Sequence, residues 1–114
     1  FLRTPAREAA QKILKLKDRP TAIFAASDVM ALEVVSVAQS AGISVPKELS
    51  VIGFDDNPLA LGGTLRLSTV FQPLVEMGRL GAEQLSQISF GKAKLPVKVL
   101  LPAKLRLRDS TAGI

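Results

Sequence analysis

Helical and extended patterns alternate along this chain of 114 residues, and the alternation narrows the folds that it can adopt. Apolar residues recur at spacings of three and four over residues 5–17 and 74–88, which predicts two helices. A third is predicted over 29–41, a mostly apolar stretch between the capping residues Ser27-Asp28 and Gly42. Short apolar runs predict buried strands over 21–26 and 49–54, and further strands over 68–71, 97–101 and 104–108, the last of them half-exposed. Because helices separate the strands, the sequence predicts an α/β fold with a mostly parallel sheet flanked by helices. We expect residues 110–114 to form a frayed tail.

The residue types exclude much familiar chemistry. The chain has no cysteine and no histidine, so disulfides, Cys/His zinc sites and imidazole-dependent catalytic triads are excluded. The sequence contains no phosphate-binding loop of the form GxxxxGK[ST], no GxGxxG and no GxSxG. The net charge of +5 comes from the two ends of the chain, whereas residues 21–91 are net acidic, so no compact DNA-reading element is indicated. A start at Phe1, without the apolar core of a signal peptide, suggests a fragment.

Polar side chains follow three of the predicted strands where each strand ends. Ser27 and Asp28 follow the first, Asp55 and Asp56 the second, and Gln72 the third. In parallel α/β sheets ligands bind beyond the carboxyl ends of the strands, so these residues predict a site for a small polar ligand. The simpler alternatives are a helix cap for Ser27 or Asp28 and a turn for the acidic pair. A magnesium site of Asp28, Asp55 and Asp56 in a phosphoryl-transfer enzyme is a weaker alternative, since the phosphate-binding motifs are missing.

The helix predicted over 29–41 is apolar around most of its circumference. Such a helix is buried on more than one side, so a second face needs cover after the first has packed on the sheet. We expect a partner subunit to supply that cover. The alternative is that the same residues pack inside a monomer, beneath the helix predicted over 74–88.

Four sequence blocks follow one another along the chain: PTAIFAASDVMAL, GISVPKELSVIGFDD, LSTVFQPLVEMGRLGAEQL and VLLPAKLRLRDST. In this order and spacing they resemble the lactose-repressor/galactose-repressor family of bacterial transcription regulators, over nearly the whole chain. Periplasmic sugar-binding proteins share the fold and the SD and GFD features, and they remain an alternative. The VPKELSVIGFDD and STVFQP blocks look more like the regulators.

The resemblance implies the C-terminal part of a two-lobed, periplasmic-binding-protein-like effector domain, preceded by a helix-turn-helix headpiece and a hinge. Residues 1–73 and 103–114 would form the second lobe, and residues 74–102 would cross to the missing first lobe. The implied function is effector sensing and dimerisation in a cytoplasmic, non-enzymatic regulator, a repressor that responds to a sugar or a similar small polar ligand. The implied partners are that effector, a second copy of the chain, and operator DNA through the headpiece alone. No cofactor, metal or membrane is expected.

Carried over by motif, the effector contacts are Ser27, Asp28, Asp55 and Gln72, with Ser27 standing where the family often has asparagine. The implied dimer interface combines the helix over 29–41 with the loop after the second strand. Its members are Met30, Val34, Val37, Pro58, Leu59 and Leu61. One departure from the family pattern lies on that helix, because Glu33 stands where glycine is common.

Overall fold

The computed structural model describes residues 3–92 and 98–113. The chain divides into two compact units, of which the first comprises Phe1–Phe71 with Lys104–Ile114 and the second comprises Gln72–Ala103. The elements in chain order are α1 (Arg3–Leu14), β1 (Ala22–Phe24), α2 (Asp28–Ser40), β2 (Ser50–Asp55), the 3₁₀ helix η1 (Pro58–Leu61), β3 (Ser68–Phe71), α3 (Leu74–Ser89) and β4 (Lys104–Arg106).

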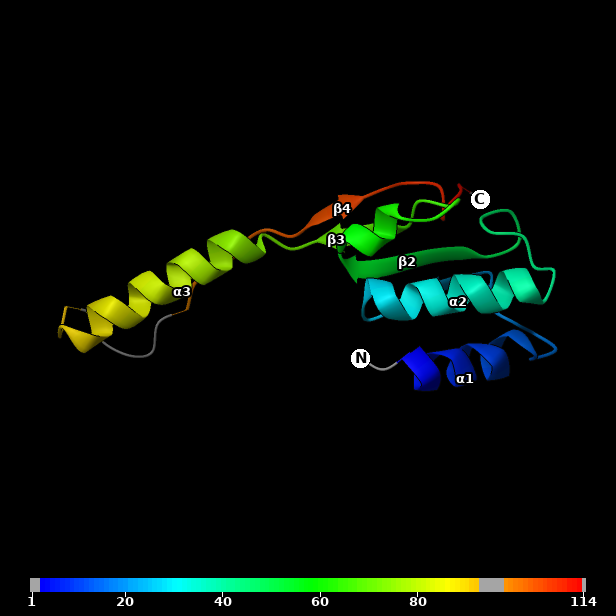
Figure 1. Cartoon of the computed structure of the whole chain (residues 1–114), viewed down its shortest axis with the longest axis horizontal. Coiled ribbons are helices and arrows are strands. Elements are labelled where there is room, and N and C mark those ends of the chain that lie inside the picture. The colour runs from blue at the N-terminus through cyan, green and yellow to red at the C-terminus, as the bar shows by residue number, and fades with distance from the viewer. Residues whose placement is uncertain (1–2, 93–97, 114) are drawn as a thin grey trace. The chain divides into compact units, whose positions relative to one another are not determined.

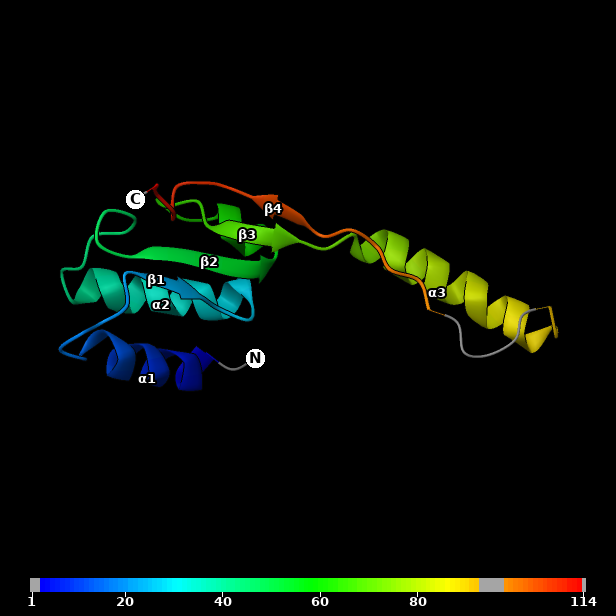
Figure 2. The same cartoon turned by 180° about the vertical axis from the view of Figure 1, so that it is seen from behind.

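The sheet of the first unit has the strand order β1-β2-β3-β4 (Figures 1 and 2). β1, β2 and β3 run parallel, and β4 returns antiparallel beside β3. Gly53 of β2 faces Thr69 of β3, which in turn faces Arg106 of β4. This arrangement confirms the predicted α/β class with a mostly parallel sheet.

The strand predicted over 97–101 is not formed within residues 98–101, and Val97 lies outside the described residues. An apolar run becomes a strand only where a neighbouring strand offers backbone partners. Residues 98–101 belong to the second unit and take part in no described ladder.

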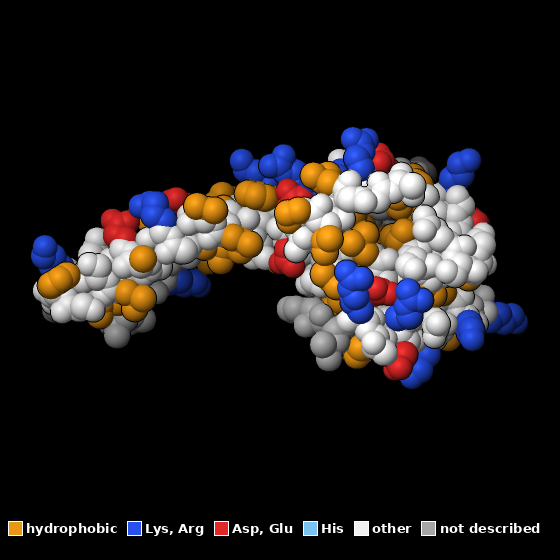
Figure 3. Space-filling view, in the orientation of Figure 1, with side chains coloured by type: hydrophobic (Ala, Val, Ile, Leu, Met, Phe, Trp, Pro, Cys, Tyr) orange, Lys and Arg blue, Asp and Glu red, His pale blue; other side chains and the backbone are white. Residues whose placement is uncertain are grey.

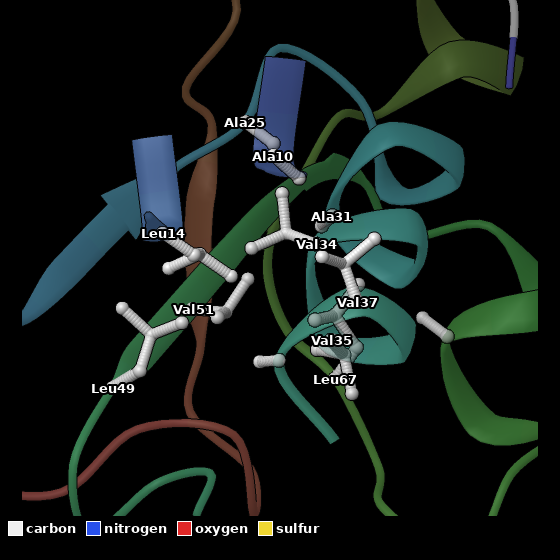
Figure 4. Close-up of a cluster of buried hydrophobic side chains, with 12 residues drawn as sticks. Ala10, Leu14, Ala25, Ala31, Val34, Val35, Val37, Leu49, Val51 and Leu67 are labelled. Atoms are coloured by element: carbon white, nitrogen blue, oxygen red, sulfur yellow. The ribbon is translucent and has the colours of Figure 1, made fainter. Parts of the chain in front are cut away.

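Helix α2 lies between the sheet and α1 (Figures 1 and 2). It ends near Gly42, whose φ of +73° is a conformation that favours glycine. Ala6, Ala10 and Leu14 of α1 are buried, and the core cluster joins α1, α2 and the sheet (Figure 4). The members of this cluster are Ala10, Leu14, Ala25, Ala31, Val34, Val35, Val37, Ala38, Leu49, Val51, Ala60 and Leu67.

This layering corrects the argument for a subunit interface on α2. Val34 is 6% exposed and Val37 is 7% exposed within a single chain, because α1 covers the helix face that the sheet leaves open. The apolar circumference of α2 therefore requires no partner subunit, and these two side chains are core residues. Leu59 and Leu61 of η1 are exposed at 47% and 56%, and their place in an interface stays a prediction.

Of the two strands predicted to be buried, β2 is buried on one face only, and β1 contains no buried residue. Val51 and Gly53 lie on the α2 side and are buried, whereas Phe24 is 64% exposed. The rings of Phe24 and Phe54 meet edge to face with centroids 6.4 Å apart. Apolar residues thus occupy both faces of β2, but in the first unit α2 covers one of them and α1 lies beyond α2 on the same side (Figures 1 and 2).

Residues 110–112 are held by hydrogen bonds to β2 and β3, so the expectation of a frayed tail was wrong for them. Ser110 is fully buried, and its hydroxyl accepts a hydrogen bond from Ser68 N at 2.8 Å and donates one to Val51 O at 2.6 Å. Val51 N donates in return to Ser110 O at 2.8 Å. A serine hydroxyl can donate and accept at once, so Ser110 joins β2 to the start of β3.

The second unit is built on α3. None of the residues of α3 is buried within the described chain, and Leu74, Val75 and Leu85 are exposed at 56%, 89% and 68%. Apolar side chains gather along this helix in Figure 3. A helix with so much exposed apolar surface is typical of a segment that packs against something else. The role predicted for residues 74–102, crossing to another lobe, stays a prediction.

Candidate functional site

Ser27 ends the β1–α2 connection and caps α2. Its backbone is extended, with φ −156° and ψ 160°, and its Oγ accepts a hydrogen bond from Met30 N at 3.3 Å. Ser27 is only 3% exposed. The simpler alternative, a helix cap, is therefore confirmed for this residue.

Asp28 is fully buried at the start of α2, and both oxygens of its carboxylate accept hydrogen bonds. Thr69 Oγ1 donates to Oδ1, and Asn57 N donates to Oδ2 at 2.6 Å. Burial raises the pKa of Asp28 above its ordinary value, the two hydrogen bonds oppose that rise, and the carboxylates of Asp55 and Asp56 add to it. Asp28 thus ties the start of α2 to β3 and to the turn after β2.

Gly53 makes room for this carboxylate. A Cβ at position 53 would overlap Asp28 Oδ1 and would lie 3.0 Å from both Asp28 Cα and Leu67 Cδ2. The glycine before Phe54 and Asp55 is therefore needed for close approach of β2 to α2.

Two consecutive aspartates turn the chain after β2, and both have positive φ angles. Asp55 has φ 112° and Asp56 has φ 56°, values that residues other than glycine rarely adopt. Such backbone costs on the order of 1–3 kcal/mol for each residue and persists only where the surroundings hold it.

The side chain of Asp56 is hydrogen-bonded by Arg108, from the C-terminal segment, and forms a longer and more exposed ion pair with Arg106. Arg108 Nη2 donates to Asp56 Oδ1, and both side chains are 15% exposed. Arg106 Nε lies 3.7 Å from Asp56 Oδ2, and its guanidinium stacks over the Phe71 ring at 5.2 Å from the centroid. On the backbone, Asp56 N donates to Thr69 Oγ1 at 3.3 Å.

Asp55, half-buried, is the last residue of β2 and pairs in register with Phe71. Ser27, Asp28 and Asp55 therefore meet at the carboxyl end of the parallel strands, as the sequence predicted. Gln72 follows Phe71 directly and is the first residue of the second unit. A role of these four residues in effector binding stays a prediction.

Three further residues of the site were missed from sequence: Asn57, Thr69 and Arg108. One signal was available, because the alternation over 104–108 places Arg108 on the same side of a strand as Arg106. Nothing local, however, connects Arg108 with Asp56, which is 52 positions earlier in the chain.

The site does not have the form of a metal centre. Within residues 3–92 and 98–113, no group of three acidic side chains is arranged to hold a metal ion. The carboxylate of Asp28 is occupied by Thr69 and Asn57, and that of Asp56 by Arg108.

Within residues 3–92 and 98–113, no helix combines the length and the hydropathy that a membrane span needs.

Comparison with known proteins gives relatives over nearly the whole chain. The profile of a family described as "Periplasmic binding protein-like domain" matches residues 2–111. The HTH-type transcriptional regulator DegA of Bacillus subtilis is 42% identical over 95% of this chain and 32% of its own length. The catabolite control protein A of Priestia megaterium is 36% identical over 91% of this chain and 31% of its own length. The chain thus spans about a third of these relatives.

Solved structures of transcription regulators have the same fold as this chain. A LacI family transcriptional regulator from Bifidobacterium animalis subsp. lactis superposes with a TM-score of 0.90 at 32% identity, over 98% of this chain and 41% of that one. The transcriptional regulator CelR, in a complex with cellobiose, superposes with a TM-score of 0.91 at 32% identity, over 96% of this chain and 34% of that one. The chain therefore belongs to the periplasmic binding protein-like domain family, and within it to the transcription regulators of the lactose-repressor/galactose-repressor family.

Proposed function

We propose that this chain is part of the effector-binding domain of a transcription repressor and that its effector is a sugar or a similar small polar molecule. The observation that carries the proposal is the turn at the carboxyl end of β2, where Asp55 is presented next to the buried carboxylate of Asp28. Carboxylates accept hydrogen bonds from hydroxyl groups, which sugars offer in number. The cellobiose complex of CelR supports this class of ligand.

The four predicted site residues divide into two roles. Asp55 and Gln72 contact the effector, since they stand at the strand ends and are half-buried. Ser27 and Asp28 have little or no exposed surface, so they act on the effector through the turn and the helix that they hold. The chain carries out no catalysis and needs no cofactor or metal in this role.

The proposed partners are those of a longer, cytoplasmic protein that contains this chain. We infer a homodimer whose contact includes Met30, Pro58, Leu59 and Leu61, and operator binding through a helix-turn-helix headpiece outside this chain. The exposed leucines of η1 support the contact, and the apolar side chains of α3 support a crossing of residues 74–102 to a first lobe.

The test uses the longer protein that contains this chain, titrated calorimetrically with glucose, sucrose and cellobiose. We expect one of these sugars, or a close relative, to bind and to change operator affinity. Asp55→Asn and Gln72→Ala should each weaken binding at least tenfold, whereas the control Asp18→Asn, at an exposed position outside the site, should leave it unchanged. Wild-type affinity in Asp55→Asn would refute the site. Metal-dependent phosphatase turnover that is lost in Asp55→Ala would refute the assignment as a sensor.

A further inference from the structure

Arg108 holds the turn after β2 from the opposite end of the chain. Its side chain donates through Nη1 to Leu67 O at 2.9 Å and through Nη2 to Asp56 Oδ1. Its backbone N donates to Ser68 Oγ at 2.8 Å. Three hydrogen bonds from one residue, 15% exposed, therefore connect the C-terminal segment with the start of β3 and with Asp56.

The residue that Arg108 holds adjoins the proposed effector contact. Asp55 and Asp56 have consecutive positive φ angles, 112° and 56°, which a short turn of non-glycine residues does not keep unaided. Asp56 is restrained at its carboxylate by Arg108 and at its N–H by Thr69 Oγ1, at 3.3 Å. Because Asp56 is bound at both its backbone and its side chain, the backbone of Asp55 has little freedom to leave this conformation.

We infer that Arg108 is a positioning residue for the effector site, acting through Asp56 to keep Asp55 in the orientation that binds the effector. Only the last step of this inference, the binding of an effector by Asp55, rests on the proposed function. A lysine cannot replace Arg108 here, because the two guanidinium nitrogens reach two different acceptors and an ammonium is a single point. Arg106 provides the matched comparison, since it also faces Asp56 but at 3.7 Å and with a side chain that is 53% exposed.

The first part of the test needs no ligand and uses the 114-residue chain itself. Amide hydrogen exchange is measured for Arg108→Lys and for Arg106→Lys against wild type. We expect the amides of Asp56 and Asn57 to exchange at least tenfold faster in Arg108→Lys and within twofold of wild type in Arg106→Lys. The amide of Val51, bonded to Ser110 O, should keep its protection in both variants. Unchanged exchange at Asp56 and Asn57, or equal loss at Val51, would overturn the inference, the second because it would mean general unfolding.

The second part measures sugar affinity in the longer protein. Arg108→Lys should weaken binding at least tenfold while its urea unfolding stays cooperative, and Arg106→Lys should bind within twofold of wild type. A loosened turn with unchanged affinity would overturn the positioning role. If wild type itself binds none of the sugars, the proposed effector class fails, while the exchange result still decides whether Arg108 holds the turn.

Discussion

Replacing Gly53 by alanine should destabilise the first unit by about 1–3 kcal/mol, the usual cost of an added methyl group in a closed core. The added Cβ would overlap Asp28 Oδ1 and would lie 3.0 Å from Asp28 Cα and from Leu67 Cδ2. One of these neighbours is backbone, and both side chains are fully buried, so neither can move aside cheaply. Either β2 separates from α2, or Asp28 Oδ1 moves and loses its hydrogen bond from Thr69.

The measurement is thermal and urea unfolding of the 114-residue chain, followed by far-UV circular dichroism. For a domain of this size, each kcal/mol lowers Tm by about 4–8 °C. The matched control is Gly62→Ala, because a Cβ there meets only Leu59 O, at 3.6 Å, and the φ of −83° suits alanine. We expect the control to stay within about 0.5 kcal/mol of wild type. If Gly53→Ala is as stable as the control, the tight packing of Asp28 against β2 is wrong.

Two further predictions concern the C-terminal segment. Ser110→Ala should lower the free energy of unfolding by about 1–3 kcal/mol in urea titration, because it leaves the buried Ser68 N–H without its acceptor; a loss smaller than about 0.5 kcal/mol would contradict that role. The hydrogen bonds from Arg66 lower the pKa of Asp109 to about 2, so the pair contributes stability above the ordinary pKa of 3.8 and loses it as the pH falls towards 2. Asp109→Asn should therefore be less stable than wild type at pH 6, and the difference should shrink as the pH falls and disappear below pH 2; a difference that does not shrink would refute the assignment.

The location of the candidate site could be predicted from the sequence, but the burial and hydrogen-bond partners of its residues could not. Strand ends followed by Ser27, Asp28 and Asp55 are local signals, and parallel topology brings such ends together. Which carboxylate is buried is not local, because it depends on the space left at Gly53 and on donors elsewhere in the chain. Asp28 and Asp55 look alike in sequence, yet only the folded chain encloses the first of them.

The sequence by itself determined the elements whose signals are local. The helix expected over 74–88 is Leu74–Ser89, and the strand expected over 68–71 is Ser68–Phe71, since helical periodicity and bounding prolines act within a few residues. Only the tertiary structure decided that α1 covers the second face of α2, and that residues 98–101 do not join the sheet. It likewise decided that Ser110 joins β2 to β3 and that Arg108 holds the turn after β2. These outcomes depend on which surfaces and hydrogen-bonding groups other elements leave open, and a pattern read along one segment carries no information about a partner 40 or more positions away.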